Sequence, residues 1–106
     1  MLKGRIVLIP FPFTDLTGQK VRPALVLHVS RGEDCIVAFI STRIEKRNPY
    51  DIRVSPSSTN GLKVESVVKV DKLATLQKKI VIGELGVLER QNLHIVDVAL
   101  RKLFKI

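Results

Sequence analysis

The chain has 106 residues, 45% of them hydrophobic, which suits a single domain over residues 1–106 with one core. One cysteine and two histidines exclude an intramolecular disulfide and argue against a zinc site, so we expect neither metal nor cofactor. No apolar run approaches the roughly 20 residues that cross a bilayer, and 18 Lys and Arg against 10 Asp and Glu give a net charge of +8, which favours an anionic partner.

Up to Leu85 the chain consists of short runs rich in β-branched residues, separated by residues that favour turns. The predicted strands cover residues 5–9, 22–29, 35–40, 50–54, 64–76 and 80–85, and Gly86 is expected to end the last one. Between the first two strands, residues 14–20 predict an exposed loop, and residues 43–60 predict a basic surface segment with turns.

From Glu89 to Phe104 the apolar residues change to helical spacing, with Leu93, Val96 and Leu100 on one stripe. This pattern predicts an amphipathic helix that packs its apolar stripe against the sheet. Many short strands followed by one helix predict a mainly β fold with a C-terminal helix, in which a small curled barrel carries the helix on its surface.

The predicted hairpin brings an arginine and a hydroxyl together. A turn centred just after Gly32 places Arg22 opposite Arg43, with Ser41 one pair further in on the same face. If the turn is one residue longer or shorter, Thr42 lies opposite Arg22 instead. A hydroxyl is therefore expected within reach of the guanidinium in either register.

An arginine beside a hydroxyl suits a phosphodiester, because the planar guanidinium donates to two phosphate oxygens at once and stays charged. RNA supplies its own nucleophile in the 2′-hydroxyl, so its cleavage needs no metal. From the residues alone two plainer interpretations remain open: Arg22 as a surface charge at a strand start, and Ser41 and Thr42 as turn residues. His28 is expected to be a structural residue, and His94 a packing or surface residue.

Five stretches resemble, in order, the motifs of the MazF/PemK toxins of type II toxin–antitoxin systems, which are mRNA interferases. The stretches are Gly4–Leu8, Lys20–Leu27, Ala38–Ile44, Gly61–Val68 and Leu73–Leu76. The resemblance implies a homodimeric SH3-like small β-barrel of the CcdB/MazF type that acts in the cytoplasm and not at a membrane. It also implies a metal-independent, sequence-selective endoribonuclease that cuts single-stranded RNA, leaves a cyclic phosphate and a 5′-hydroxyl, and is silenced by an acidic antitoxin.

Carried over to this sequence, the resemblance makes Arg22 the catalytic arginine, Ser41 the catalytic hydroxyl residue and Thr42 its neighbour. Together with the basic segment, it gives the residues expected to contact RNA as Thr17, Gly18, Gln19, Lys20, Arg43, Lys46 and Ser66. Two alternatives remain open, namely a non-catalytic nucleic-acid-binding module and a toxin of the same fold that acts on a protein such as DNA gyrase.

Overall fold

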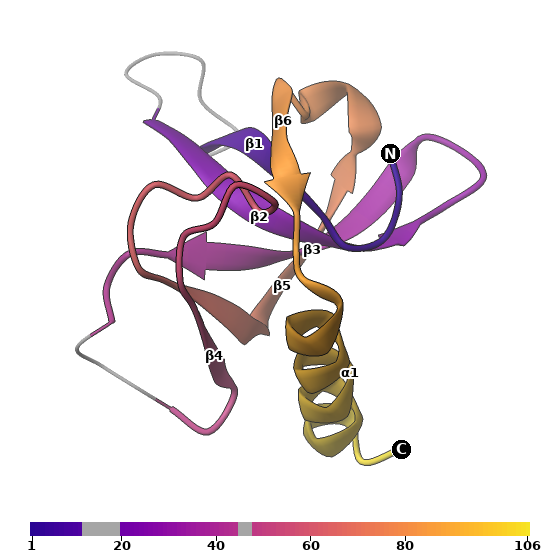
Figure 1. Ribbon diagram of the computed structural model, residues 1–106. Coiled ribbons are helices and arrows are strands. Elements are labelled where there is room, and N and C mark those ends of the chain that lie inside the picture. Colours follow the sequence, from indigo (N-terminus) through magenta and orange to yellow (C-terminus); the bar gives the residue numbers. More distant parts are fainter. Residues whose placement is uncertain (12–19, 45–47) are drawn as a thin grey trace.

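The computed structural model describes residues 1–11, 20–44 and 48–106. Within these ranges the chain forms six strands, one short 3-10 helix and one α-helix (Figure 1). The strands are β1 (Arg5–Phe11), β2 (Lys20–Val29), β3 (Asp34–Ser41), β4 (Asp51–Val54), β5 (Ser66–Gln77) and β6 (Gly83–Val87), and the helices are η1 (Lys78–Ile80) and α1 (Arg90–Phe104).

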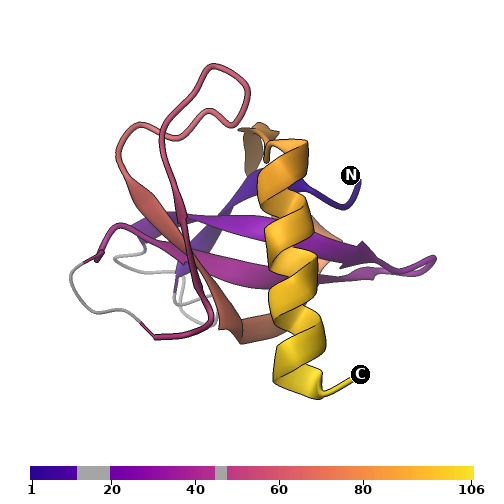
Figure 2. The ribbon, with the colours of Figure 1, turned by 60° about the horizontal axis from the view of Figure 1, so that its bottom comes forward.

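The strands form one antiparallel sheet in the order β4-β5-β3-β2-β1-β6. The sheet curls strongly, and α1 lies across one side of it (Figure 2). The predicted mainly β fold with a curled sheet and a C-terminal helix is therefore confirmed.

The last strand differs from its prediction. The sequence predicts a strand over residues 80–85, whereas β6 begins later. The apolar run turns the chain in η1, because the N–H of Val81 donates to the carbonyl oxygen of Lys78 at 3.1 Å. Gly86 lies inside β6 and does not end it. A Cβ at Gly86 would lie 2.3 Å from the carbonyl oxygen of Thr59, so only glycine permits this approach.

The sheet buries apolar side chains on both faces, because successive residues of a strand point to opposite sides. The face covered by α1 holds Ile6, Leu25, Ala38, Ile40, Val68 and Val70, which pack with Val96 and Ala99 of the helix. The opposite face holds a second cluster formed by Val7, Ile9, Ala24, Val26, Cys35, Val37 and Leu76. Each central strand thus serves two cores.

The register of the β2–β3 hairpin differs by two residues from the predicted one. Ala24 lies opposite Phe39 and not opposite Ser41. This shift of two residues has two causes. A bulge in β2 contributes one residue of the shift. The turn contributes the other, because it is centred on Gly32 and not after it. Because a shift of two keeps each residue on its face, continuing the pairing beyond Ala24 brings Arg22 level with Ser41.

The loop between β4 and β5 is fastened to the start of α1 by polar groups. The fully buried side chain of Asn60 donates from Nδ2 to Oε1 of Glu89 at 3.1 Å and accepts from the N–H of Leu62 at 2.9 Å. Ser57 Oγ donates to Oε2 of Glu89. This hydrogen bond from Ser57 is the main cause that lowers the pKa of Glu89 below its usual value. The ionised carboxylate therefore stabilises the fold.

Glu89→Gln tests this link. The lowered pKa of Glu89 means that its contribution is present above the ordinary carboxyl pKa and is lost as the pH falls through the lower folded value. We expect the variant to lose about 1–2 kcal/mol of unfolding free energy at pH 7, with the deficit shrinking at lower pH. Urea unfolding at pH 7 and pH 3.5 measures both values.

The matched control is Glu84→Gln, which removes an exposed carboxylate paired with Arg5. Exposed ion pairs contribute little, so we expect a change of about 0.5 kcal/mol or less at either pH. A Glu89→Gln deficit that stayed constant between the two pH values would contradict the proposed role of the charge.

Candidate functional site

A cleft of about 730 Å³ lies where β2, β3 and β5 approach the ends of their pairing. Its lining residues come from these three strands and from the residues just after β3. They are Arg22, Phe39, Ile40, Ser41, Arg43, Lys69, Asp71, Lys72 and Leu73.

Strand pairing places the polar side chains of the cleft on one face. Phe39 is opposite Ala24 of β2 on one side and opposite Lys69 of β5 on the other. Ser41 lies two residues beyond Phe39, and Arg22 two residues before Ala24, so both point to the same face. Ala24 belongs to the cluster on the side away from α1, and the cleft therefore opens on that side.

An irregularity in β5 forms the wall of the cleft. Ala38 pairs with Leu73, while the next residue, Phe39, pairs with Lys69, so residues 70–72 of β5 have no partner in this ladder. Such bulges bend a strand and redirect its side chains. Asp71 and Lys72 of this unpaired stretch line the cleft together with Lys69 and Leu73 on either side of it.

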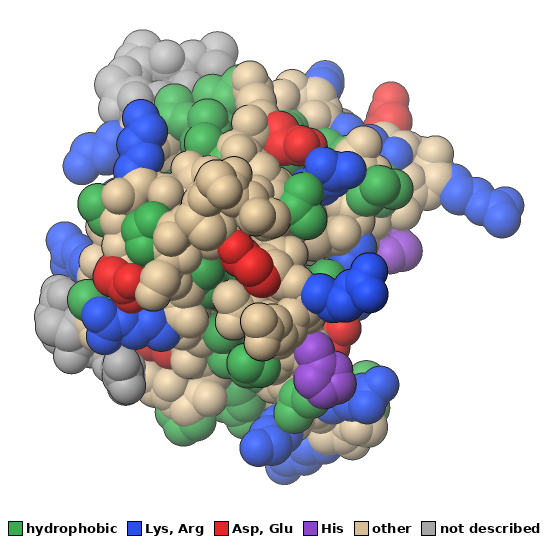
Figure 3. Space-filling model, viewed as in Figure 1, with side chains coloured by type: hydrophobic (Ala, Val, Ile, Leu, Met, Phe, Trp, Pro, Cys, Tyr) green, Lys and Arg blue, Asp and Glu red, His purple; other side chains and the backbone are tan. Residues whose placement is uncertain are grey.

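The charges of the cleft are predominantly positive. Arg22, Arg43, Lys69 and Lys72 line it, and Asp71 is the one acidic residue among the described lining residues. On the face drawn in Figure 3, Lys and Arg side chains are spread widely and do not form one patch. Net charge alone therefore does not locate the site, whereas the cleft gathers four cations.

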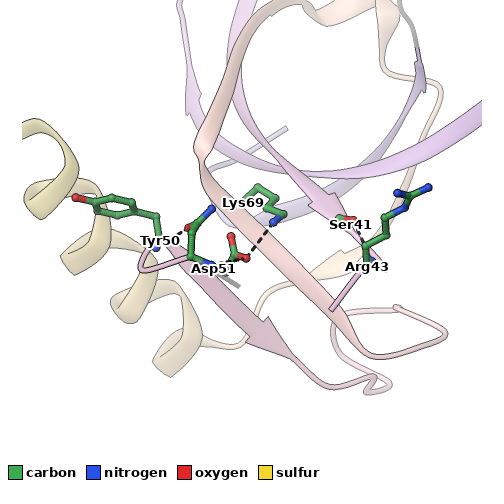
Figure 4. Close-up of polar contacts among 6 residues, drawn as sticks. Ser41, Arg43, Tyr50, Asp51 and Lys69 are labelled. Atoms are coloured by element: carbon green, nitrogen blue, oxygen red, sulfur yellow. Dashed lines mark hydrogen bonds and ion pairs between the residues drawn. The ribbon is translucent and has the colours of Figure 1, made fainter. Parts of the chain in front are cut away.

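Two of the polar side chains are held in place. Ser41 Oγ accepts a hydrogen bond from the N–H of Arg43 at 3.0 Å, which leaves its own proton available for donation (Figure 4). Lys69 Nζ donates to Asp51 Oδ2 at 2.9 Å across β4 and β5. The cleft thus contains a fixed hydroxyl and a fixed ammonium.

The structure brings together some of the predicted site residues and not others. Arg22, Ser41 and Arg43 line the cleft, and Thr42 follows β3 without lining it. Ser66 is 2% exposed and donates to the carbonyl oxygen of Val64, so it lies outside the cleft.

The remaining predicted RNA contacts are also placed elsewhere or not described. Lys20 is exposed at the start of β2 and does not line the cleft. Thr17, Gly18, Gln19 and Lys46 lie outside the described residues. His28 and His94 are exposed and outside the cleft lining. This agrees with the expectation for His94, whereas His28, which was expected to be structural, lies at the surface.

Sequence reasoning missed Phe39, Lys69, Asp71 and Lys72. Lys69 lies between the buried residues Val68 and Val70, a pattern that places it on the face away from α1. That alternation was a usable signal for Lys69. The same alternation includes Asp71, two residues beyond Lys69, whereas Lys72 gave no such signal because its position depends on the bulge.

Other chemistries find little support among the described residues. No group of three or more His, Cys, Asp or Glu in this part of the chain could hold a metal ion. The Cys35 thiol is buried, and desolvation is the main cause that raises its pKa, which disfavours the nucleophilic thiolate. None of the described helices has the length and apolar character to span a membrane.

Comparison with protein families matches residues 2–104 to PemK-like, MazF-like toxins of type II toxin–antitoxin systems. Comparison with curated proteins finds no match. Among solved structures, the Mycobacterium tuberculosis toxin MazF-mt6 superposes with a TM-score of 0.78 at 22% identity, over 96% of this chain and 97% of that one.

Two further structures are similar over nearly their whole length. An endoribonuclease in complex with its cognate antitoxin from Mycobacterial species has a TM-score of 0.76 at 20% identity, covering 100% of this chain and 96% of that one. MazE–MazF from Deinococcus radiodurans has a TM-score of 0.75 at 22% identity, covering 98% and 94%. At these identities the superpositions establish a shared fold, the curled barrel with a C-terminal helix.

Proposed function

Because this chain belongs to the PemK-like, MazF-like toxin family of type II toxin–antitoxin systems, we propose that it is a metal-independent endoribonuclease. Its substrate is single-stranded RNA, cut at preferred sequences in the cytoplasm, and residues 1–106 act as one toxin domain. The observation that carries the proposal is the cleft in which Arg22 and Ser41, from neighbouring strands, lie among further cations.

The cleft suits a phosphodiester of RNA in charge and in hydrogen-bond donors. The guanidinium of Arg22 can donate to two phosphate oxygens, and Arg43 and Lys72 add charge for neighbouring phosphates. Phe39, half-buried in the lining, offers an aromatic surface of the kind on which bases of single-stranded RNA pack. A single strand can present bases and phosphates together, whereas the bases of a duplex are stacked inside.

The reaction we propose is internal transesterification. The 2′-oxygen attacks the adjacent phosphorus, the bond from phosphorus to the 5′-oxygen breaks, and the products carry a 2′,3′-cyclic phosphate and a 5′-hydroxyl. Negative charge grows on the non-bridging oxygens, where each fixed donor supplies about 3 kcal/mol. Arg22 and the Ser41 hydroxyl are such donors.

Proton transfer needs a different group. A guanidinium keeps its proton at any working pH, so Arg22 is a poor base. Asp71 carries the one carboxylate among the described lining residues, and we assign it the proton of the 2′-hydroxyl. The leaving 5′-oxygen takes a proton from solvent or from a protonated cleft residue.

Arg22→Ala tests the electrostatic role. Purified protein is expected to cleave a mixed-sequence RNA in excess chelator and to leave cyclic-phosphate ends, and the variant is expected to lose about 10²- to 10³-fold in rate because a donor to the transition state is gone. Denaturing gels with end-group analysis measure the products, and circular dichroism checks folding.

The matched control is Arg31→Ala, which removes the same charge from the β2–β3 turn, at the far end of β2 and outside the cleft lining. We expect it to retain nearly full activity. Equal activity of Arg22→Ala and Arg31→Ala would refute the assignment. RNA binding without cyclic-phosphate ends would favour a non-catalytic module, and inhibition of DNA supercoiling with intact RNA would favour action on gyrase.

Ser41→Ala and Asp71→Asn separate a donor from a base. Loss of the Ser41 donor is expected to lower the rate about 10²- to 10³-fold. Loss of the Asp71 carboxylate is expected to lower the rate about 10²- to 10⁴-fold, because the proposed base for the 2′-hydroxyl is gone. Single-turnover rates measure both, and an unchanged rate in Asp71→Asn would move the base elsewhere.

We also propose that the protein is a homodimer with a cognate antitoxin. An acidic, partly disordered segment laid over the same cleft would neutralise its cations and exclude RNA at once. A small acidic open reading frame beside the gene is the expected source. Its purified product should stop RNA cleavage at equimolar ratio, and failure of every such product to inhibit would contradict the proposal.

A further inference from the structure

We propose that Asp51, on the edge strand β4, is a positioning residue that fixes the Lys69 ammonium as an oriented donor in the cleft. The inference rests on the proposed function, since it assumes that the cleft binds RNA. Asp51 does not line the cleft itself, so the proposed positioning effect on RNA passes through Lys69.

The contact between the Asp51 and Lys69 side chains is short, and both side chains are largely shielded from solvent. Asp51 and Lys69 are paired residues of neighbouring strands, with Nζ 2.9 Å from Oδ2. The Asp51 side chain is 3% exposed and that of Lys69 is 16% exposed. Figure 4 shows the two groups pointing at each other between the strands.

Asp51 is itself held by the turn before β4. The N–H of Asn48 donates to Oδ2 of Asp51 at 3.2 Å, and the N–H of Asp51 donates to the carbonyl oxygen of Asn48 at 3.1 Å. Asn48 Oδ1 in turn accepts from the N–H of Tyr50 at 2.8 Å. The carboxylate is therefore anchored by the N–H of Asn48, and it can serve as a fixed point for the lysine.

This pair differs from the other ion pairs of the described chain. Lys3–Asp97, Arg5–Glu84 and Arg53–Glu65 join side chains that are each at least 34% exposed. Such exposed pairs are weak and screened by salt. A nearly buried pair pays a desolvation cost that its attraction barely offsets, so stability alone explains it poorly.

The position of Lys69 in the cleft indicates a role for the pair in binding phosphate. An ammonium has three donors, and Asp51 occupies one of them. A free lysine must lose the freedom of four rotatable bonds when it binds a phosphate, whereas Lys69 is ordered before RNA arrives. Its remaining donors can then bind a phosphate in the cleft. Lys69 lies opposite Phe39, and Ser41 is the next residue of β3 on the same face.

Asp51→Asn separates positioning from charge. By charge alone, removing a carboxylate close to a cationic cleft should tighten RNA binding. If Asp51 positions Lys69, the variant should instead bind about tenfold more weakly, the size expected when one lysine side chain must be ordered on binding. The probe is a 2′-deoxy oligonucleotide, which lacks the nucleophile, and cleavage of the matching RNA gives KM and kcat.

The expected pattern is a rise in Kd and KM with kcat within about twofold, because Lys69 contacts the substrate before and during the reaction alike. Glu65→Gln is the matched control: it makes the same change in net charge at an exposed pair outside the cleft lining. That variant should bind as tightly as the wild type or slightly more tightly.

A double variant tests the route through Lys69. Lys69→Met and the combination Asp51→Asn/Lys69→Met should have the same Kd within about twofold, since Asp51 has nothing left to position. If Asp51→Asn alone does not fold, the combination replaces it, because it removes both buried charges together. It should then bind about tenfold more weakly than Glu65→Gln.

The outcomes separate the two proposals. A wild type that neither binds nor cleaves RNA defeats the proposed function at the first measurement. A wild type that does both, beside an Asp51→Asn variant with unchanged or tighter Kd, leaves the endoribonuclease standing and overturns the positioning role. An effect of Asp51→Asn that persists in full on the Lys69→Met background also overturns it.

Discussion

The antiparallel pairing of β3 with both of its neighbours is the constraint on which the cleft depends. Paired residues of adjacent strands point to the same side of a sheet. Phe39 of β3 therefore aligns Ala24 and Lys69 in one row, and Asp51 extends that row to β4. Groups far apart in sequence share one face without a dedicated loop to bring them there. The backbone hydrogen bonds that form the sheet also fix the spacing of the site.

The strand pattern could be predicted from sequence, because β-branched runs and turn residues are local signals. The terminal helix and the mainly β class followed from the same kind of evidence. The meeting of Arg22 with a hydroxyl on one face was also predictable, although the assumed register was wrong. An error of two residues preserves the face, so Ser41 came near Arg22 despite the unpredicted bulge in β2. The alternation of side chains along each strand therefore predicted more of the site than the exact strand register did.

The irregular wall of the cleft depends on a feature that leaves no local signal. The extra residues of β5 opposite the step from Ala38 to Phe39 are a property of the curled sheet and not of the β5 sequence. A similar reason explains the misplaced last strand. The sequence predicts that Gly86 ends the last strand. Gly86 is instead required inside β6, because the backbone at Thr59 packs against it. Both errors come from contacts between segments distant in the chain, which periodicity cannot report.

The balance between positive and negative side chains distinguishes the cleft from the remaining surface. Outside it, Arg5, Arg53 and Lys3 each pair with an exposed carboxylate, which offsets part of the basic surplus. Among the described residues of the cleft, four cations face a single lining carboxylate, Asp71, while the carboxylate of Asp51 lies behind Lys69 at the edge of the sheet. A polyanion thus gains more at the cleft than elsewhere. An RNA strand and an acidic protein segment both carry the negative charge that complements these cations. Each is therefore expected to displace the other from the cleft, whereas a neutral ligand would displace neither.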